Sequence, residues 1–119
     1  MGSELGIERG ERAVVIWNVQ GMSTREENRR KLRRLAEYAG RRGWEIVCLA
    51  DLRSKGEGVV WLREEEERVA LIHFKRAGVL LGGDALGLWV KEGQKMWLEE
   101  RVVAVTLGGV RVVSVYQPV

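Results

Sequence analysis

The sequence predicts a single α+β domain, a twisted and mostly antiparallel sheet with one main helix on one of its faces. Short apolar runs of β-branched character recur along the chain, and glycine-rich turns separate them. Only one stretch, at about residues 25–42, repeats its apolar positions with helical spacing. With 119 residues and 45% hydrophobic content, the chain can bury one core but is too short for two.

The helix is expected at about residues 25–42, with one narrow apolar face. Its apolar positions follow the spacing i, i+3, i+4 and i+7, and they are Leu32, Leu35, Ala36 and Ala39. Ser23 with Glu26, or Thr24 with Glu27, offers a capping box at its start. The opposite face carries several arginines. They form either a phosphate-binding stripe or a solvated surface, and an outer helix needs a charged face in any case.

The strands are expected where apolar runs are short and end at polar or glycine residues. The predicted strands are residues 13–17, 44–50, 59–62, 69–74, 78–81, 86–90, 101–107 and 110–116. Four glutamates at 64–67 form the solvated turn of one hairpin, and Gly108-Gly109 is a two-residue turn between the last two strands. The first strand and the last hairpin are apolar on both sides of the pleat, so the helix cannot cover them alone.

The charge and the cysteine content indicate what the protein could bind and in which compartment it is expected. The net charge of +3 and the pI of about 9.3 permit nucleic-acid binding without demonstrating it. The single cysteine, Cys48, lies in an apolar run and has no disulfide partner in the chain, so we expect a buried thiol in an intracellular protein. Residues 1–11 are expected to be a tag or disordered.

Three short motifs each follow a predicted strand, where side chains from different strands can converge on a ligand. They are Trp17-Asn18-Val19-Gln20-Gly21, Cys48-Leu49-Ala50-Asp51-Leu52-Arg53 and Ser114-Val115-Tyr116-Gln117-Pro118. Taken alone, an asparagine in such a place usually forms a turn and an aspartate usually caps one. Their order along the chain carries more information than any one of them.

In this order the motifs resemble those of the endonuclease/exonuclease/phosphatase superfamily, the DNase I-like fold that includes apurinic/apyrimidinic endonucleases. Two further segments fit the same pattern, Arg76-Ala77-Gly78-Val79-Leu80-Leu81 and Glu100-Arg101-Val102-Val103. The resemblance covers residues 12–119, and the sequence is most similar to those of endonuclease domains of trypanosomatid non-LTR retrotransposons. It implies the N-terminal half of a DNase I-like α/β/β/α sandwich.

The resemblance also implies roles for particular residues. Asn18, Asp51 and Tyr116 would be catalytic, and Gln20 would join Asn18 and Tyr116 in contacting DNA or phosphate. Asp51 takes the position of the carboxylate that holds Mg²⁺ in the family. A hard cation held by carboxylate oxygen neutralises the charge that builds on a phosphodiester during hydrolysis, and neutral donors nearby stabilise the same charge.

Departures from the family pattern weaken the expected catalysis. Asp51 is one methylene shorter than the family glutamate, and Gln20 replaces an acidic residue of the apurinic endonucleases. The remaining family residues, an Asp-x-Asn motif, a further Asn and an Asp-His pair, would follow Tyr116 beyond Val119. His73 lies within a predicted strand, where it is expected to pack rather than to act as a base.

The sequence therefore predicts the N-terminal segment of a retrotransposon-type, Mg²⁺-dependent DNA endonuclease that nicks target DNA. We expect it to be inactive in isolation and its parent element to act in the nucleus. The alternative is a non-catalytic, self-associating half-domain that binds DNA weakly or not at all. The phosphatase branch is disfavoured because no lipid-headgroup motif is recognisable. A homodimer is expected through an apolar sheet face formed by alternate residues of 14–16, 102–107 and 110–115.

Overall fold

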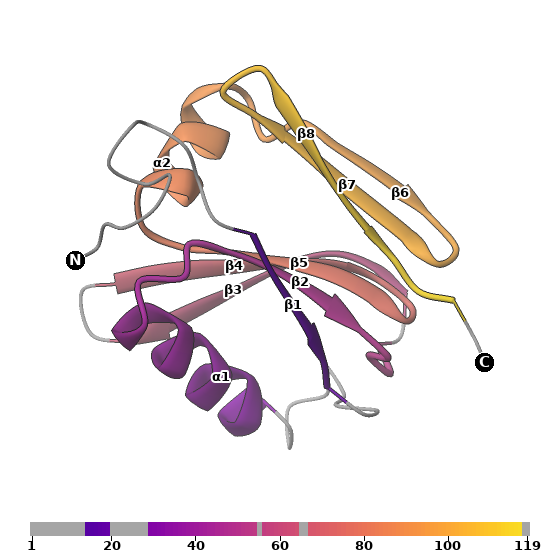
Figure 1. The fold of residues 1–119 in the computed structure, drawn as a ribbon, viewed down its shortest axis with the longest axis horizontal. Helices are drawn as coiled ribbons and strands as arrows, with labels where there is room; N and C mark the ends of the chain where they lie inside the picture. The colour runs from indigo at the N-terminus through magenta and orange to yellow at the C-terminus, as the bar shows by residue number, and fades with distance from the viewer. Residues whose placement is uncertain (1–13, 20–28, 55, 65–66, 118–119) are drawn as a thin grey trace.

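A computed structural model describes residues 14–19, 29–54, 56–64 and 67–117. Its elements are β1 (Val14–Asn18), α1 (Arg29–Arg41), β2 (Ile46–Ala50), β3 (Glu57–Glu64), β4 (Glu67–Phe74), β5 (Ala77–Leu81), α2 (Gly83–Lys91), β6 (Met96–Glu99), β7 (Val102–Leu107) and β8 (Val110–Val115). A five-stranded sheet has the order β1-β2-β5-β4-β3, and a three-stranded sheet has the order β6-β7-β8. In Figure 1, α1 lies on one face of the larger sheet, and the smaller sheet and α2 lie on the other. The chain is therefore a mixed, layered α and β domain.

The larger sheet is mixed rather than purely antiparallel. β1 pairs with β2 in parallel, from Val14 opposite Ile46 to Asn18 opposite Ala50, whereas β2, β5, β4 and β3 pair antiparallel. Parallel neighbours need a crossover between them, and α1 lies in that connection. The described part of this helix, Arg29–Arg41, falls inside the predicted span, and its four predicted apolar residues are all buried. The proposed capping boxes lie outside the described residues.

Two apolar cores lie on opposite faces of the larger sheet. Successive residues of β2 alternate between them: Val47 and Leu49 face the core under α1, and Ile46 and Cys48 face the core against the smaller sheet. Burial on both faces explains why β2 is a continuous apolar run. On the α1 side, the Trp17 ring packs edge-on against Trp44, with the ring centroids 5.9 Å apart.

The smaller sheet corrects the expectation that one face of the sheet would be left open. Val103, Val105 and Leu107 of β7 and Val112 of β8 pack into the core between the sheets. The hairpin predicted at Gly108-Gly109 is confirmed, and both glycines have positive φ, as a tight two-residue turn requires. Thus the chain supplies its own second layer.

The structure overturns the strand predicted at residues 86–90. These residues belong to α2, which buries Ala85, Leu86 and Trp89 at helical spacing. The Trp89 indole N–H donates to the carbonyl of Lys95 at 2.9 Å. A short apolar run does not distinguish a strand from a buried helix by periodicity. The strand β6 was not predicted at all.

None of the described helices is long and apolar enough to cross a membrane.

The two sheets differ in width, so the smaller one does not cover the outer strands of the larger one. β8 packs over β2 and β5, β7 over β5 and β4, and β6 over β4. β1 and β3 therefore extend beyond the smaller sheet on opposite sides. On β1, Ile16 is 82% exposed and Val14 is 47% exposed. On β3, Trp61 is 40% exposed.

Candidate functional site

Three predicted site residues lie at one end of the sandwich. Asn18 ends β1 opposite Ala50, so it lies beside Asp51, the first residue after β2. Tyr116 follows β8, and the hydroxyl of Ser114 donates to the carbonyl of Leu49 at 3.2 Å, which holds the end of β8 against the end of β2. The structure thus brings Asn18, Asp51 and Tyr116 to the same edge. Gln20 lies outside the described residues.

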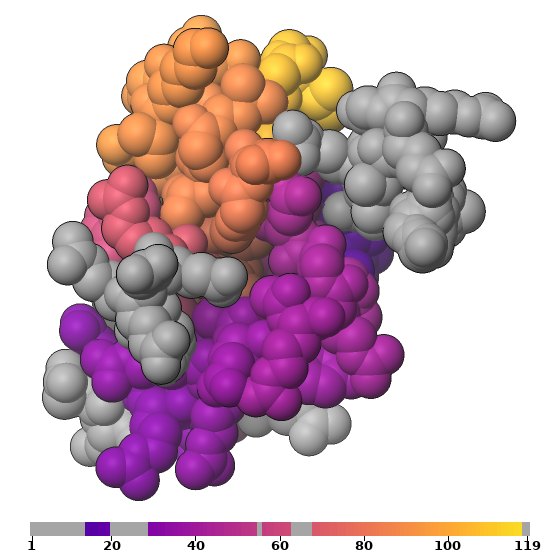
Figure 2. All heavy atoms as spheres, turned by 90° about the vertical axis from the view of Figure 1, so that its left-hand side faces the viewer, coloured from indigo at the N-terminus to yellow at the C-terminus, as the bar shows by residue number. Residues whose placement is uncertain are grey.

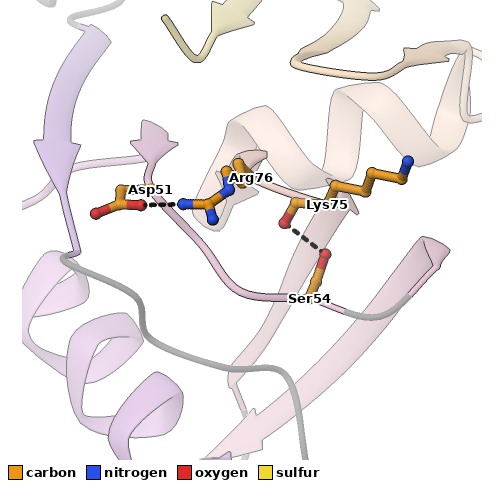
Figure 3. A network of polar contacts seen from close by, with 4 residues as sticks. All are labelled: Asp51, Ser54, Lys75 and Arg76. Atoms are coloured by element: carbon orange, nitrogen blue, oxygen red, sulfur yellow. Dashed lines mark hydrogen bonds and ion pairs between the residues drawn. The ribbon is translucent and has the colours of Figure 1, made fainter. Parts of the chain in front are cut away.

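Arg76 connects Asp51 with Tyr116. Its Nη1 donates to the Asp51 Oδ1 at 3.0 Å, and its guanidinium carbon lies 5.4 Å from the centre of the Tyr116 ring. The ion pair is partly exposed, with 28% of the Asp51 side chain and 47% of the Arg76 side chain open to solvent. Figure 3 shows the two side chains pointing toward each other across the end of the sheet. A carboxylate, a guanidinium and a phenol therefore form one continuous row.

Backbone hydrogen bonds fix the loop that carries Asp51. The N–H of Leu52 donates to the Arg76 carbonyl at 3.1 Å, and the N–H of Ser54 donates to the Lys75 carbonyl at 3.1 Å. The hydroxyl of Ser54 donates to the same Lys75 carbonyl at 2.7 Å (Figure 3). The loop after β2 is thus held along the turn between β4 and β5, and this sets the distance between Asp51 and Arg76.

A small basic cavity opens beside this row. It has a volume of about 310 Å³ and is lined by Lys75, Arg76, Glu100, Arg101 and Tyr116. The Lys75 Nζ lies 3.5 Å from the Glu100 Oε1, so turns from the two different sheets meet here. Lys75, Arg76 and Arg101 contribute three positive charges to the lining, and Glu100 contributes one negative charge. Positive charge and a phenol at one opening suit an anion of the size of a phosphate group.

The backbone at this edge adopts conformations that are costly for residues other than glycine. Among the described residues, four residues other than glycine have positive φ, and three of them lie here: Asp51 at 62°, Lys75 at 48° and Arg101 at 73°. Such conformations persist where the surrounding structure enforces them, and they cluster at ligand sites. Lys75 and Arg101 lie in two-residue hairpin turns, where positive φ is common. Asp51 lies outside a hairpin, so its conformation is the one of the three that a tight turn does not explain.

The described residues include few carboxylates at this edge that could hold a magnesium ion. They contain no group of three or more His, Cys, Asp or Glu side chains that could hold a metal ion. Asp51 is paired with a guanidinium, which occupies one side of its carboxylate. A divalent cation would have to displace Arg76 and recruit further oxygen ligands.

His73 lies away from this row, buried at 5% exposure on β4. Its Nδ1 has no hydrogen-bond partner among the described residues, and burial lowers the pKa of its imidazole. Its expected packing within a strand is confirmed. Burial likewise raises the pKa of the Cys48 thiol, despite the opposing effect of the Ser114 side chain. Neither group is placed to take a proton from a ligand at the Arg76 cavity.

Sequence reasoning assigned no role to Lys75, Arg76 or Arg101. Arg76 and Arg101 fall within segments that carried the family resemblance, but only as parts of a pattern. The available signal was positional for Arg76, which lies beside Lys75 in the short turn between two predicted strands. Arg101 was expected as the first residue of a strand, next to Glu100. Which turns meet depends on how the sheets stack, and the sequence does not show that.

A larger cavity, of about 500 Å³, lies at the opposite end of the larger sheet, between α1 and α2. Figure 2 views this side, with α2 above and α1 below. Its lining is mainly glycine and apolar side chains. The lining carboxylate, Glu45, accepts a hydrogen bond from the N–H of Ala85 at 2.7 Å in the first turn of α2. Among the described residues, the charged side chains that line this cavity are Glu45 and Arg68, and Glu45 is bound to the start of α2, so the Asp51 edge is the stronger candidate.

Comparisons with protein-family models, with curated proteins and with solved structures found no match in any of the three. The assignment of the site therefore depends on its geometry and on the motifs of the sequence.

Proposed function

We propose that the edge formed by Asn18, Asp51, Arg76 and Tyr116 is the phosphodiester-binding part of a DNA endonuclease of the DNase I-like kind. The observation that carries the proposal is the Arg76 guanidinium, which lies between the Asp51 carboxylate and the Tyr116 ring and borders a basic cavity. The motifs around Asn18, Asp51 and Tyr116 provide the independent support from sequence.

In this proposal a backbone phosphate of DNA enters the cavity. Arg76 exchanges its bond to Asp51 for a charge-assisted hydrogen bond to a phosphate oxygen, while Arg101 and Lys75 contribute further positive charge. The Tyr116 phenol donates to the same phosphate. Guanidinium groups suit this exchange because they keep their charge and bond carboxylate and phosphate with similar geometry.

Hydrolysis requires more than binding. The attacking water needs a base, and the charge that develops on phosphorus needs a metal or an equivalent cluster of donors. Among the described residues, the carboxylates at this edge include Asp51, which pairs with Arg76, and Glu100, which pairs with Lys75. Mg²⁺ therefore belongs to the proposal only with additional ligands, and we expect this chain to bind DNA without cleaving it.

Binding is tested by fluorescence anisotropy with a short labelled DNA duplex at several salt concentrations. Arg76→Ala and Arg101→Ala should each weaken binding about tenfold at low salt and reduce the salt dependence by about one counterion. Arg111→Ala is the matched control, because it removes the same charge near the opposite end of β8. Equal losses in all three variants would show that net charge, and not this cavity, binds DNA.

Cleavage is tested by nicking of supercoiled plasmid in Mg²⁺ or Mn²⁺. The expected result for this chain is no nicking above background. Robust nicking that Asp51→Ala abolishes would show that Asp51 is catalytic as it stands and would contradict the non-cleaving proposal. Failure of DNA binding itself would favour the alternative, a non-catalytic and self-associating domain.

A further inference from the structure

The overhang of β1 beyond the smaller sheet exposes an apolar step. Val14 and Ile16 face the side on which the smaller sheet packs, because the alternate residues Val15 and Trp17 pack toward α1. We call the surface of Val14 and Ile16, together with the adjoining free edge of β8, the β1 step. Contiguous exposed apolar surface, such as that of Val14 and Ile16 beside an open strand edge, marks interaction sites in soluble proteins.

Among the described residues, neither strand at the β1 step has a strand neighbour along its outer edge. β1 has β2 as its neighbour, and β8 has β7. The Tyr116 N–H donates to the Arg101 carbonyl at 2.8 Å, so in the antiparallel pattern residues 112, 114 and 116 direct their backbone groups toward β7. Arg111, Val113 and Val115 therefore direct theirs outward. β1 contains no charged residue and β8 contains only Arg111, so little charge protects these edges from pairing.

We propose that a second copy of this chain occupies the β1 step. The twofold axis that relates the two copies runs parallel to the strands and lies between the two sheet layers. The partner's β1 would lie in the layer of the smaller sheet, beside β8 and directly over β1. The larger sheet would likewise continue into the partner's β8, β7 and β6. Each layer then contains five strands from one copy and three from the other, which makes the interface isologous.

The overhang selects this arrangement over simple joining of like edges. If β8 paired with the partner's β8, the two smaller sheets would become continuous. The two β2 strands below them would then need to be neighbours, and two β1 strands would have to share the space between them. Turning the partner over removes this clash. Its β1 then lies in the layer of the smaller sheet, where a space one strand wide is open beside β8.

The inverted pairing also accounts for the exposed apolar residues. Ile16 and Val14 would meet their counterparts across the sandwich, at the separation of about 10 Å usual for packed sheets. The outer face of β8, where Val113 is 48% exposed and Val115 is 52% exposed, would continue the surface on which the partner's α1 packs. The interface would consist of two paired strand edges around an apolar centre. Stable protein interfaces typically bury about 800 Å² per partner.

The dimer would also complete the candidate site. β1 ends at Asn18 and β8 leads to Tyr116 at the same end of the sandwich, so the axis along the strands keeps these ends together. The partner's Asn18 would then lie beside Tyr116. Each site would include an amide from the other copy, and the two sites would lie side by side. The dimer does not depend on the proposed function.

The test is sedimentation velocity of the purified chain over a micromolar concentration range. The wild-type chain should be a dimer. Ile16→Lys should weaken association at least tenfold, and its circular dichroism should stay unchanged because Ile16 is already 82% exposed. Trp97→Lys is the matched control on β6, where Trp97 is 57% exposed at the far edge of the smaller sheet, and it should remain a dimer. A monomeric wild-type chain, a dimeric Ile16→Lys variant or a monomeric Trp97→Lys variant would each overturn the proposal.

A crosslinking experiment locates the contact independently. Ile16→Cys should crosslink efficiently through a short bifunctional thiol reagent, because the two side chains point toward each other in the gap of about 10 Å between packed sheets. Trp97→Cys should not crosslink, and the wild-type chain should not either, because its single cysteine is buried. Crosslinking of Trp97→Cys but not of Ile16→Cys would place the interface at β6 and refute the β1 step.

Discussion

The guanidinium of Arg76 meets the carboxylate of Asp51 at 3.0 Å, although 25 residues separate them along the chain. The pair joins the end of β2 to the turn between β4 and β5. It holds a carboxylate beside a cation at the one edge where three residues other than glycine adopt positive φ. Two effects therefore act at Asp51, the ion pair and the backbone conformation, and substitutions can separate them.

Asp51→Asn should destabilise the fold only slightly, by about 0.5 kcal/mol, because the ion pair that it removes is partly exposed. Asp51→Ala should cost about 1 kcal/mol more, since alanine tolerates the φ of 62° less well than asparagine does. Urea unfolding of the two variants measures the difference. Equal stabilities would show that the left-handed conformation at Asp51 carries no strain.

Substitution of glycine by alanine should have opposite effects on stability at Gly78 and at Gly87. A Cβ at Gly78 would lie 2.6 Å from Leu52 Cδ1 and 3.3 Å from the Ile72 carbonyl oxygen, and Leu52 is fully buried. Gly78→Ala should therefore destabilise the protein by about 1–3 kcal/mol. Because Leu52 follows Asp51, the displacement should also disturb the site.

Gly87→Ala is the control for that substitution. Gly87 lies in α2, is exposed, and a Cβ there meets nothing within 4 Å. Alanine in a helix interior should stabilise the protein by about 0.5–1 kcal/mol relative to glycine. Thermal unfolding of both variants gives the two signs directly, and a destabilised Gly87→Ala would indicate that α2 is not helical at this residue.

His73 should make the protein less stable in mild acid. Burial lowers its pKa in the folded state below the usual 6.5. Above pH 6.5 the imidazole is neutral in both states. As the pH falls below 6.5 the unfolded chain takes up the proton first, so stability decreases until the lower, folded pKa is reached.

His73→Leu should remove this part of the pH dependence. The variant should be about as stable as the wild type at pH 7.5, because the Nδ1 atom that it removes has no partner among the described residues. Urea unfolding at pH 7.5 and pH 5 compares the two proteins, and the contribution of the carboxylates is common to both. An unchanged loss of stability in the variant would mean that His73 does not titrate below its usual pKa.

The parts of the fold that the sequence predicts well are those in which one face is buried. The four apolar residues of α1 and the alternation of β2 show clear periodicity, because each packs against a defined layer. The run Leu86-Gly87-Leu88-Trp89-Val90 shows none, because α2 packs only one short face. β6 mixes exposed and partly buried residues and so gives no strand signal.

The site was predictable only where it depends on the ends of strands. Asn18 and Asp51 follow neighbouring parallel strands, so their proximity follows from the connection through α1. Arg76, Lys75 and Arg101 belong to turns, and their meeting requires the stacking of two sheets. The DNase I-like assignment and the roles that it implies remain a proposal.

The hydrogen bond from Ser114 to the Leu49 carbonyl joins residues 65 positions apart. On the ribosome, β1 to β5 emerge well before β8, so a nascent chain can form the larger sheet while the Asp51 edge still lacks Tyr116. Contacts between such distant residues are slow to form, since the intervening loop must close first. The core face of β2 and β5 would meanwhile be open to chaperones or to other nascent chains. The ability to bind a phosphate should therefore arise last during biosynthesis, only when the final strand has closed over the first ones.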